Sequence, residues 1–122
     1  SFHEKSVSKN RLTCNYYSVI VFHRRYYIRQ HAHERDLRVA DIARSVGLSR
    51  RATEIRFRAA TGRTLRGEIE HVRLERLRAL LTESDATIGA CTEACGFAGQ
   101  THAGRVFRQR FGMTMGQWRK GQ

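Results

Sequence analysis

One pattern occurs twice in this sequence, and it constrains the fold more than any other feature. Residues 46–49 (VGLS) match residues 95–98 (CGFA) at an offset of 49 positions. Further along, residues 57–64 match residues 107–114 at an offset of 50, with a phenylalanine, a glycine and a threonine in step. Internal repeats of about 50 residues are typical of duplicated supersecondary units. We therefore expect two copies of one small unit.

Each copy has the pattern of two helices separated by a tight turn. Apolar residues recur every three or four positions and lead to a glycine, Gly47 or Gly96, which favours the left-handed conformation that ends a helix. Ser49 is an N-cap candidate for the helix after the first of these turns. The sequence has no period-two alternation and no proline. It predicts an all-α fold with a helix-turn-helix in each half.

The spacing of apolar residues also predicts which helix faces are buried. In the first copy, two inward faces are expected, one with Val39, Ile42, Ala43 and Val46 and one with Ile55, Phe57 and Ala59 or Ala60. Upstream of these, an apolar face with Val19, Phe22, Tyr26 and Tyr27 is expected opposite Arg24, Arg25 and Arg29. In the second copy, the expected inward residues are Ala103, Val106 and Phe107.

These patterns divide the chain into four segments. Residues 1–18 lack a helical period and are interpreted as a linker or disordered leader. Residues 19–64 are expected to form the first helix-turn-helix lobe and residues 83–122 the second. Residues 65–82 are expected to form the long linker helix that joins the two lobes.

The charge balance favours a polyanionic partner. The chain carries 23 Lys and Arg against 11 Asp and Glu, for a net charge of +12, and 20 of the 23 cations are arginine. Arginine binds phosphates and guanine edges with its planar guanidinium fork. An arginine-rich surface that is merely solvated, from a high-GC coding bias, is the alternative interpretation. The duplicated helix-turn-helix favours nucleic acid over that alternative.

The second helix of each unit is the candidate DNA-reading element, because the major groove of DNA admits one α-helix. In that groove arginine pairs with guanine, glutamine with adenine and glutamate with cytosine. The candidate base-contacting residues are Arg50, Arg51, Glu54, Gln100, Thr101, His102 and Arg105. The candidate phosphate-contacting residues, which are cations or helix N-caps, are Arg38, Ser49, Arg58, Thr64, Arg66, Thr87, Arg108 and Thr114.

Other functional classes find little support in the sequence. The histidines between residues 23 and 33 do not close a four-ligand metal site, and no nucleophile lies in an activating turn. Cys91 and Cys95 are interpreted as small buried hydrophobic residues. We expect no enzymatic activity, no metal, no cofactor and no membrane partner. The main rival function is non-specific binding of DNA or RNA by an architectural protein.

Residues 27–119 resemble the DNA-binding domain of the AraC/XylS family of bacterial transcription regulators. The matching segments are residues 39–43 (VADIA), 47–51 (GLSRR), 56–58 (RFR), 62–64 (GRT), 73–76 (RLER), 80–81 (LL), 94–97 (ACGF), 105–108 (RVFR) and 111–114 (FGMT). The stretch at residues 27–32 is most similar to the xylose-operon regulator branch of the family. The chain departs from the usual Thr-Pro step at Thr64-Leu65 and Thr114-Met115.

The resemblance implies seven helices in two lobes and two recognition helices in successive major grooves of double-stranded DNA, about 34 Å apart. It implies a cytoplasmic, nucleoid-associated regulator, an activator of sugar metabolism with xylose as the candidate sugar. The partners it implies are operator or promoter DNA, RNA polymerase and an effector-sensing domain in the full-length protein. The departures from the family pattern, among them Gly104 within the second recognition helix, together predict a less stable second lobe.

Overall fold

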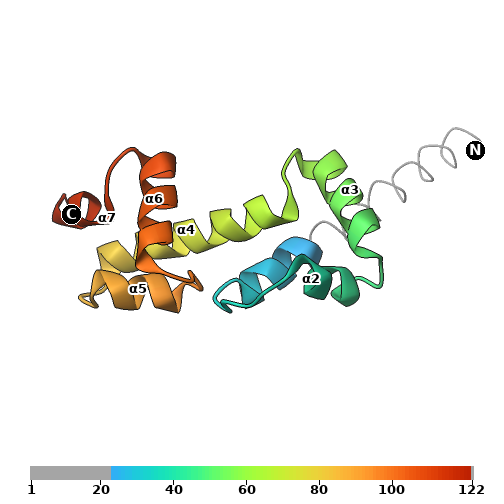
Figure 1. The fold of residues 1–122 in the computed structure, drawn as a ribbon, viewed down its shortest axis with the longest axis horizontal. Coiled ribbons are helices and arrows are strands. Elements are labelled where there is room, and N and C mark those ends of the chain that lie inside the picture. Colours follow the sequence, from blue (N-terminus) through green and yellow to red (C-terminus); the bar gives the residue numbers. More distant parts are fainter. Residues whose placement is uncertain (1–22, 122) are drawn as a thin grey trace, which may run out of the picture.

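The computed structural model describes residues 23–121, and this part of the chain is helical, with no strand. Its elements are a first helix over residues 23–31 and then α2 (Val39–Ser45), α3 (Arg50–Thr61), α4 (Leu65–Glu83), α5 (Ile88–Ala94), α6 (Gln100–Phe111) and α7 (Met115–Lys120) (Figure 1). These seven helices confirm the predicted all-α fold. The predicted leader, residues 1–18, lies outside the described residues.

The long helix α4 connects two groups of helices. The first helix, α2 and α3 lie towards one end of α4, and α5, α6 and α7 lie at the other end (Figure 1). Each group has its own hydrophobic cluster, and α4 contributes to both. It supplies Leu65, Ile69 and Val72 to the first cluster and Leu74, Leu77 and Leu81 to the second. One helix therefore supports both groups, as expected for the linker helix.

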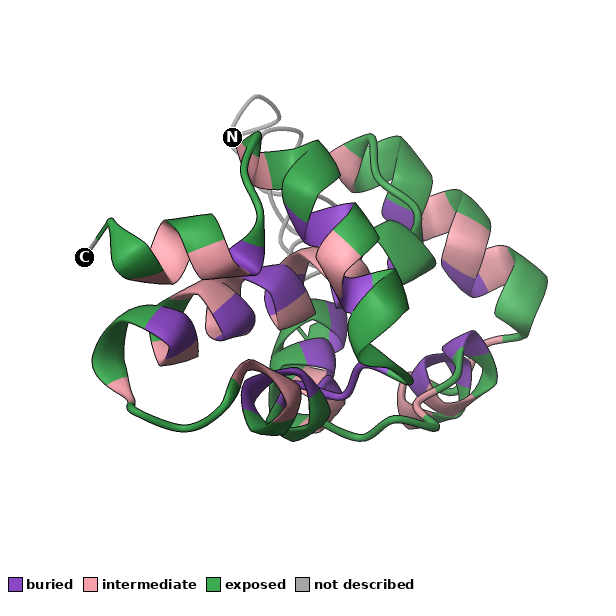
Figure 2. Cartoon of the chain, turned by 60° about the vertical axis from the view of Figure 1, so that its left-hand side comes forward, coloured by how far each residue is buried: buried purple, intermediate pink, exposed green. Residues whose placement is uncertain are grey.

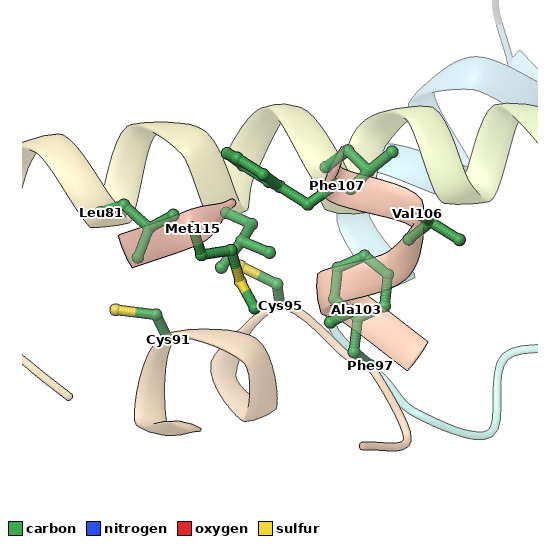
Figure 3. Packing of buried hydrophobic residues seen from close by; sticks show 10 residues of the cluster. Leu81, Cys91, Cys95, Phe97, Ala103, Val106, Phe107 and Met115 are labelled. Carbon is green, nitrogen blue, oxygen red and sulfur yellow. The ribbon is translucent and has the colours of Figure 1, made fainter. Parts of the chain in front are cut away.

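The second cluster is drawn in Figure 3. The ring of Phe107 is fully buried beside α4, and the cluster also includes Ala103 from α6 and Phe97 from the turn before it. Ala103, Val106 and Phe107 are all buried, which confirms the predicted inner face of this helix. In Figure 2 the helices carry buried residues on one side and exposed residues on the other, as amphipathic helices of a small domain do.

The first helix differs from its prediction in rotation. Arg24, Ile28 and Ala32 are fully buried at four-residue spacing, whereas Tyr26, predicted to face the core, is 54% exposed. Tyr27 is half-buried against the first cluster, while Arg25 and Arg29 are exposed as predicted. The prediction that Arg24 faces outward with Arg25 and Arg29 is therefore wrong, because the whole Arg24 side chain, its guanidinium included, is buried.

The turn glycines behave as predicted. Gly47 and Gly96 follow α2 and α5 with φ values of 71° and 92°, in the left-handed region that favours glycine. Gly96 has a second constraint, because a Cβ atom there would lie 2.4 Å from the carbonyl oxygen of Ala32. The turn of the second helix-turn-helix thus packs directly on the backbone that follows the first helix.

The described helices are not membrane-spanning elements. No helix within residues 23–121 combines the length and apolarity needed to cross a bilayer.

Candidate nucleic-acid interface

Helix α3 presents three arginines to solvent. Its N-cap is Ser49, whose Oγ accepts a hydrogen bond from the backbone N of Ala52 at 3.1 Å, as the sequence predicts. Arg50 and Arg51, in the first turn, and Arg58, two turns later, are exposed. The cap fixes where the helix starts and therefore which of its residues face outward.

The inner face of α3 differs from the prediction at Ile55 and at Ala59 or Ala60. Thr53 and Phe57 are fully buried, whereas Ile55 is 58% exposed, and Ala59 and Ala60 are exposed as well. Thr53 can be buried because its hydroxyl donates to the carbonyl oxygen of Ser49 at 2.7 Å, so no polar atom is left unsatisfied. The predictions that Ile55 and Ala59 or Ala60 face the core are therefore wrong, and Ile55 lies on the outward side of the helix.

Glu54 lies at the edge of the exposed face of α3. It is half-buried, and its Oε2 lies 3.5 Å from the backbone N of Leu65, the first residue of α4. The carboxylate thus lies where it can accept from an N-terminal N–H group of the next helix. A contact from Glu54 to a base therefore has to compete with its contact to the N–H group of Leu65.

Helix α6 repeats the arrangement with more hydrogen-bonding side chains. Gln100, Thr101, His102 and Arg105 are exposed, and the Nη2 of Arg105 lies 3.0 Å from the Nδ1 of His102. Because a guanidinium only donates, Nδ1 is the acceptor in this pair. The ring of His102 also meets the ring of Phe97 edge-on at 6.3 Å between centroids. One predicted base-contacting residue thus holds another.

The N-terminal ends of the two recognition helices open onto one groove between the lobes. This groove has a volume of about 630 Å³, and its lining includes Arg50 from α3 and His102 from α6. Arg38, Arg66 and Arg73 line it as well. The lining holds five arginines, with Arg35 the fifth, against one carboxylate, Glu70. A concave surface with such an excess of cations concentrates positive potential and attracts a polyanion.

A second groove, also of about 630 Å³, runs along α6 between α5 and α7. It brings together the predicted base-contacting residues Gln100 and Arg105 with the predicted phosphate-contacting residues Arg108 and Thr114. Residues of both predicted classes therefore lie side by side in the second lobe.

The predicted phosphate-contacting residues are all exposed. Four of them are N-caps whose hydroxyl oxygen accepts from a backbone N–H three residues on: Ser49 at 3.1 Å, Thr64 at 2.9 Å, Thr87 at 3.1 Å and Thr114 at 3.1 Å. Each hydroxyl still has a proton to donate to a phosphate oxygen. The caps therefore serve helix formation in the free protein and are compatible with phosphate contacts.

The N-terminus of α2 has a different cap. The backbone N of Arg38 donates to the Oδ2 of Asp41 at 3.0 Å, and Arg44 pairs with the same carboxylate. The Arg38 N–H, with the Arg44 guanidinium, holds the pKa of Asp41 below its ordinary value. Arg38 also lines the groove between the lobes.

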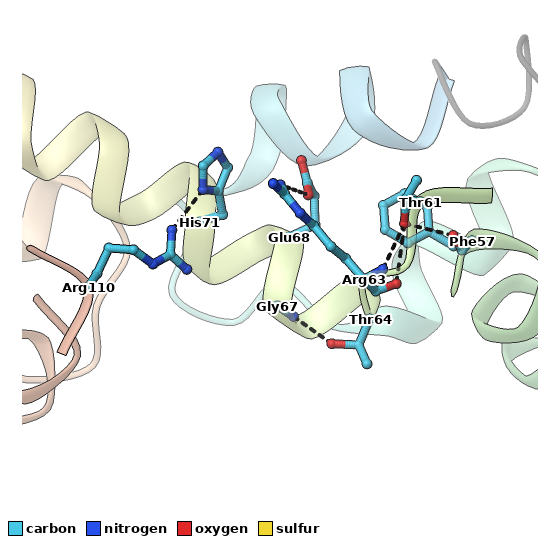
Figure 4. Close-up of polar contacts among 8 residues, drawn as sticks. All are labelled: Phe57, Thr61, Arg63, Thr64, Gly67, Glu68, His71 and Arg110. Atoms are coloured by element: carbon cyan, nitrogen blue, oxygen red, sulfur yellow. Dashed lines mark hydrogen bonds and ion pairs between the residues drawn. The ribbon is translucent and has the colours of Figure 1, made fainter. Parts of the chain in front are cut away.

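Sequence reasoning missed a third basic cluster, at the start of α4 (Figure 4). Arg110 of α6 donates to the Nδ1 of His71 at 2.9 Å, and Arg63 pairs with Glu68 at 3.1 Å. A pocket of about 320 Å³ lies between Arg63, His71 and Arg110. His71 and Arg110 lie 39 positions apart along the chain, so no local pattern could have joined them.

Metal binding finds no support in the described residues. Within residues 23–121, no group of three or more His, Cys, Asp or Glu side chains could hold a metal ion. Cys91 and Cys95 are buried, as predicted, and burial, with the nearby Cys91 thiol, raises the pKa of Cys95 to about 11. A thiol held in its protonated form is a poor metal ligand.

Comparison with known proteins gives a consistent result. A family model described as a helix-turn-helix domain matches residues 42–121. The chain is 36% identical over 93 residues to the transcriptional activator NphR of Rhodococcus sp, covering 76% of this chain and 28% of that protein. It is 30% identical over 94 residues to the xylose operon regulatory protein of Escherichia coli strain K12, covering 77% of this chain and 24% of that protein. The chain thus spans about a quarter of the length of these relatives.

A solved structure supports the same assignment. The DNA-binding domain of AdpA, a global transcriptional factor, was solved in complex with a target DNA. It superimposes on this chain with a TM-score of 0.78 at 25% identity, covering 83% of this chain and 90% of that one. The two-lobed arrangement described above is therefore shared with a domain that binds DNA.

Proposed function

The chain belongs to the AraC-type helix-turn-helix family of DNA-binding domains of transcription regulators, and from that premise we propose that it reads a specific double-stranded DNA sequence with α3 and α6 in successive major grooves. The family is one of DNA-binding domains and not of enzymes. In this proposal residues 19–64 and 83–122 are the two reading lobes, and residues 65–82 are the helix that sets the distance between them.

One observation carries the proposal. Arg50, at the start of α3, and His102, in the first turn of α6, line the same basic groove between the lobes. The N-terminal ends of both recognition helices therefore lie on one side of the molecule. Two major-groove segments on one face of B-DNA lie about 34 Å apart. In this proposal a single chain contacts both segments without a second copy.

We assign base contacts to the outward residues of the two recognition helices. These residues are Arg50, Arg51, Glu54, Gln100, Thr101, His102 and Arg105. Phosphate contacts are assigned to the exposed cations and helix caps around them, namely Arg38, Ser49, Arg58, Thr64, Arg66, Thr87, Arg108 and Thr114. Glu54 is the weakest of these assignments, because its carboxylate lies near the N–H of Leu65.

The relatives suggest the setting in which the domain acts. Both are regulators by name, one of them of a xylose operon, and each is about four times as long as the matched region. We propose that this domain belongs to an activator of a metabolic operon, with sugar metabolism as the first case to test. In the same proposal, the full-length protein carries an effector-sensing domain, contacts RNA polymerase and lies on the bacterial nucleoid.

The test is selection of bound duplexes from a random library, followed by competition at fixed salt. Sequence-specific binding gives two preferred boxes about one helical turn apart and an affinity about 10³-fold or more above bulk DNA. A ratio near one supports the rival, a non-specific architectural DNA- or RNA-binding protein. Arg25→Ala serves as a control, because it removes an exposed arginine outside both recognition helices and should bind with the same ratio as wild type.

A further inference from the structure

Ile55 is an apolar side chain in the middle of a DNA-reading surface. Among the described residues, the large hydrophobic side chains that are exposed are Tyr26, Ile55 and Met113, and Ile55 alone of these lies on a recognition helix. At 3.6 residues per turn, Ile55 lies nearly opposite the buried pair Thr53 and Phe57. It therefore points away from the core and not along its edge.

The internal repeat shows which position Ile55 occupies. At the offset of 50 residues that relates the two lobes, Ile55 corresponds to Arg105. The buried residues confirm this register, because Phe57 and its counterpart Phe107 are both fully buried. Both recognition helices also end at a left-handed glycine, with φ of 74° and 77°. The two helices thus turn corresponding positions outward, an isoleucine in the first lobe and an arginine in the second.

The neighbours of Ile55 are suited to DNA and not to a protein partner. Arg51 lies four residues before Ile55 and Arg58 three residues after it, so the three side chains form one stripe along α3. Both arginines are exposed. An aliphatic group set between two cations that bind phosphates or guanine edges is carried into the major groove with them.

The major groove offers one apolar group to such a side chain. Isoleucine can neither donate nor accept a hydrogen bond, and the 5-methyl group of thymine is the apolar feature of the base edges there. Resting on the proposed function, we infer that Ile55 determines specificity by packing against the 5-methyl group of one thymine in the first-lobe box. The first lobe then reads a methyl group at the position where the second lobe reads hydrogen-bond acceptors through Arg105.

The experiment replaces thymine by deoxyuridine, which removes the methyl group and leaves the base-pairing edge unchanged. Each thymine of the selected duplex is replaced in turn, and binding is measured at fixed salt with wild type, Ile55→Val and Ile55→Ala. For wild type we expect a loss of about fourfold at one position, the value of one buried methyl-sized group. Ile55→Ala should bind the thymine and deoxyuridine duplexes about equally, and Ile55→Val should retain part of the preference.

Tyr26→Ala is the control, because it removes an apolar side chain of similar exposure outside the recognition helices, and it should keep the wild-type response. Equal binding of every deoxyuridine duplex by wild type overturns the inference, and so does an undiminished deoxyuridine effect in Ile55→Ala. Either result leaves the proposed function intact when a preferred duplex exists. Failure of the selection to yield any preferred duplex overturns both. Thermal unfolding of each variant shows whether the fold is retained.

Discussion

The Nε of Arg73, in the middle of α4, donates a hydrogen bond to the carbonyl oxygen of Ala32 at 2.7 Å. Its Nη2 reaches the carbonyl oxygen of Glu34 at 2.8 Å. One guanidinium thus binds two carbonyl oxygens just past the end of the first helix, and that of Glu34 also accepts from the backbone N of Leu37 at 3.2 Å. Arg35 extends the contact to the other lobe by donating to the carbonyl oxygen of Ala98 at 3.4 Å. The relative position of the lobes is set by these backbone contacts as well as by α4.

Replacement of Arg73 should therefore destabilise the domain. For Arg73→Met, which keeps most of the aliphatic stem, we expect the free energy of unfolding to fall by about 1–2 kcal/mol, the lower part of the range for hydrogen bonds to charged groups because the site is partly solvated. Urea denaturation measures the change. Arg25→Met, at an exposed position of the first helix, should leave stability within about 0.5 kcal/mol of wild type. Equal stability of the two variants would show that the contact contributes nothing.

Gly96→Ala tests the packing of the two lobes more severely. The new Cβ would lie 2.4 Å from the carbonyl oxygen of Ala32, and the residue would keep a φ of 92°. We expect a loss of about 2–4 kcal/mol in thermal or urea unfolding, because backbone atoms have to move.

Two matched glycines separate the causes of that loss. Gly47→Ala has a positive φ but open space around its Cβ, so it should cost about 1 kcal/mol from backbone strain alone. Gly99 has neither constraint, and Gly99→Ala should cost only about 0.5 kcal/mol, because alanine is a poorer N-cap than glycine at the start of α6. If Gly96→Ala costs no more than Gly47→Ala, the close approach to Ala32 is unimportant.

The sequence predicted the helices of this domain well because their ends are encoded locally. Glycines at the turns and hydroxyl N-caps such as Ser49 and Thr114 act through residues three or four positions away. The register of the two copies predicted the buried Phe57 and Phe107 for the same reason.

The features that the sequence could not predict depend on hydrogen bonds between polar groups and partners that are distant in the chain or of an unexpected kind. Thr53, and not Ile55, lies on the inner face of α3, where its hydroxyl donates a hydrogen bond to the carbonyl oxygen of Ser49. The rotation of the first helix depends on Arg24, a cation that is buried. The contacts of Arg73 with Ala32 and of Arg110 with His71 join residues 41 and 39 positions apart. No periodicity in the sequence carries that information.

The base-contacting assignment predicts a position-specific loss of affinity. Arg51→Ala and Arg105→Ala should each weaken binding to the selected duplex by about 1–3 kcal/mol and relax the preference at one base pair. Binding to duplexes mutated at each position, at one salt concentration, identifies that base pair. An equal loss on all duplexes, bulk DNA included, would assign the arginine to the phosphate backbone instead.

The phosphate-contacting assignment predicts a different signature. Arg58→Ala should lower the slope of log affinity against log salt by about one and leave the base preference unchanged. The measurement is a salt titration of binding with the selected duplex. Arg25→Ala should keep the wild-type slope, since Arg25 lies outside the proposed interface. An unchanged slope for Arg58→Ala would remove Arg58 from the set of phosphate contacts.

The raised pKa of Cys95 predicts a loss of stability at alkaline pH. Burial, followed by the neighbouring Cys91 thiol, raises this pKa from an ordinary value of 9.0 to about 11 in the folded protein. Between these values the unfolded chain loses the proton while the folded protein keeps it, so the free energy of unfolding falls as the pH rises from about 9 to 11. Below pH 9 the contribution of Cys95 is fully present. Urea unfolding at several pH values should therefore give a steeper alkaline decline for wild type than for Cys95→Ala. The difference between the two proteins cancels the titration of other residues, and parallel declines would show that Cys95 ionises equally in both states.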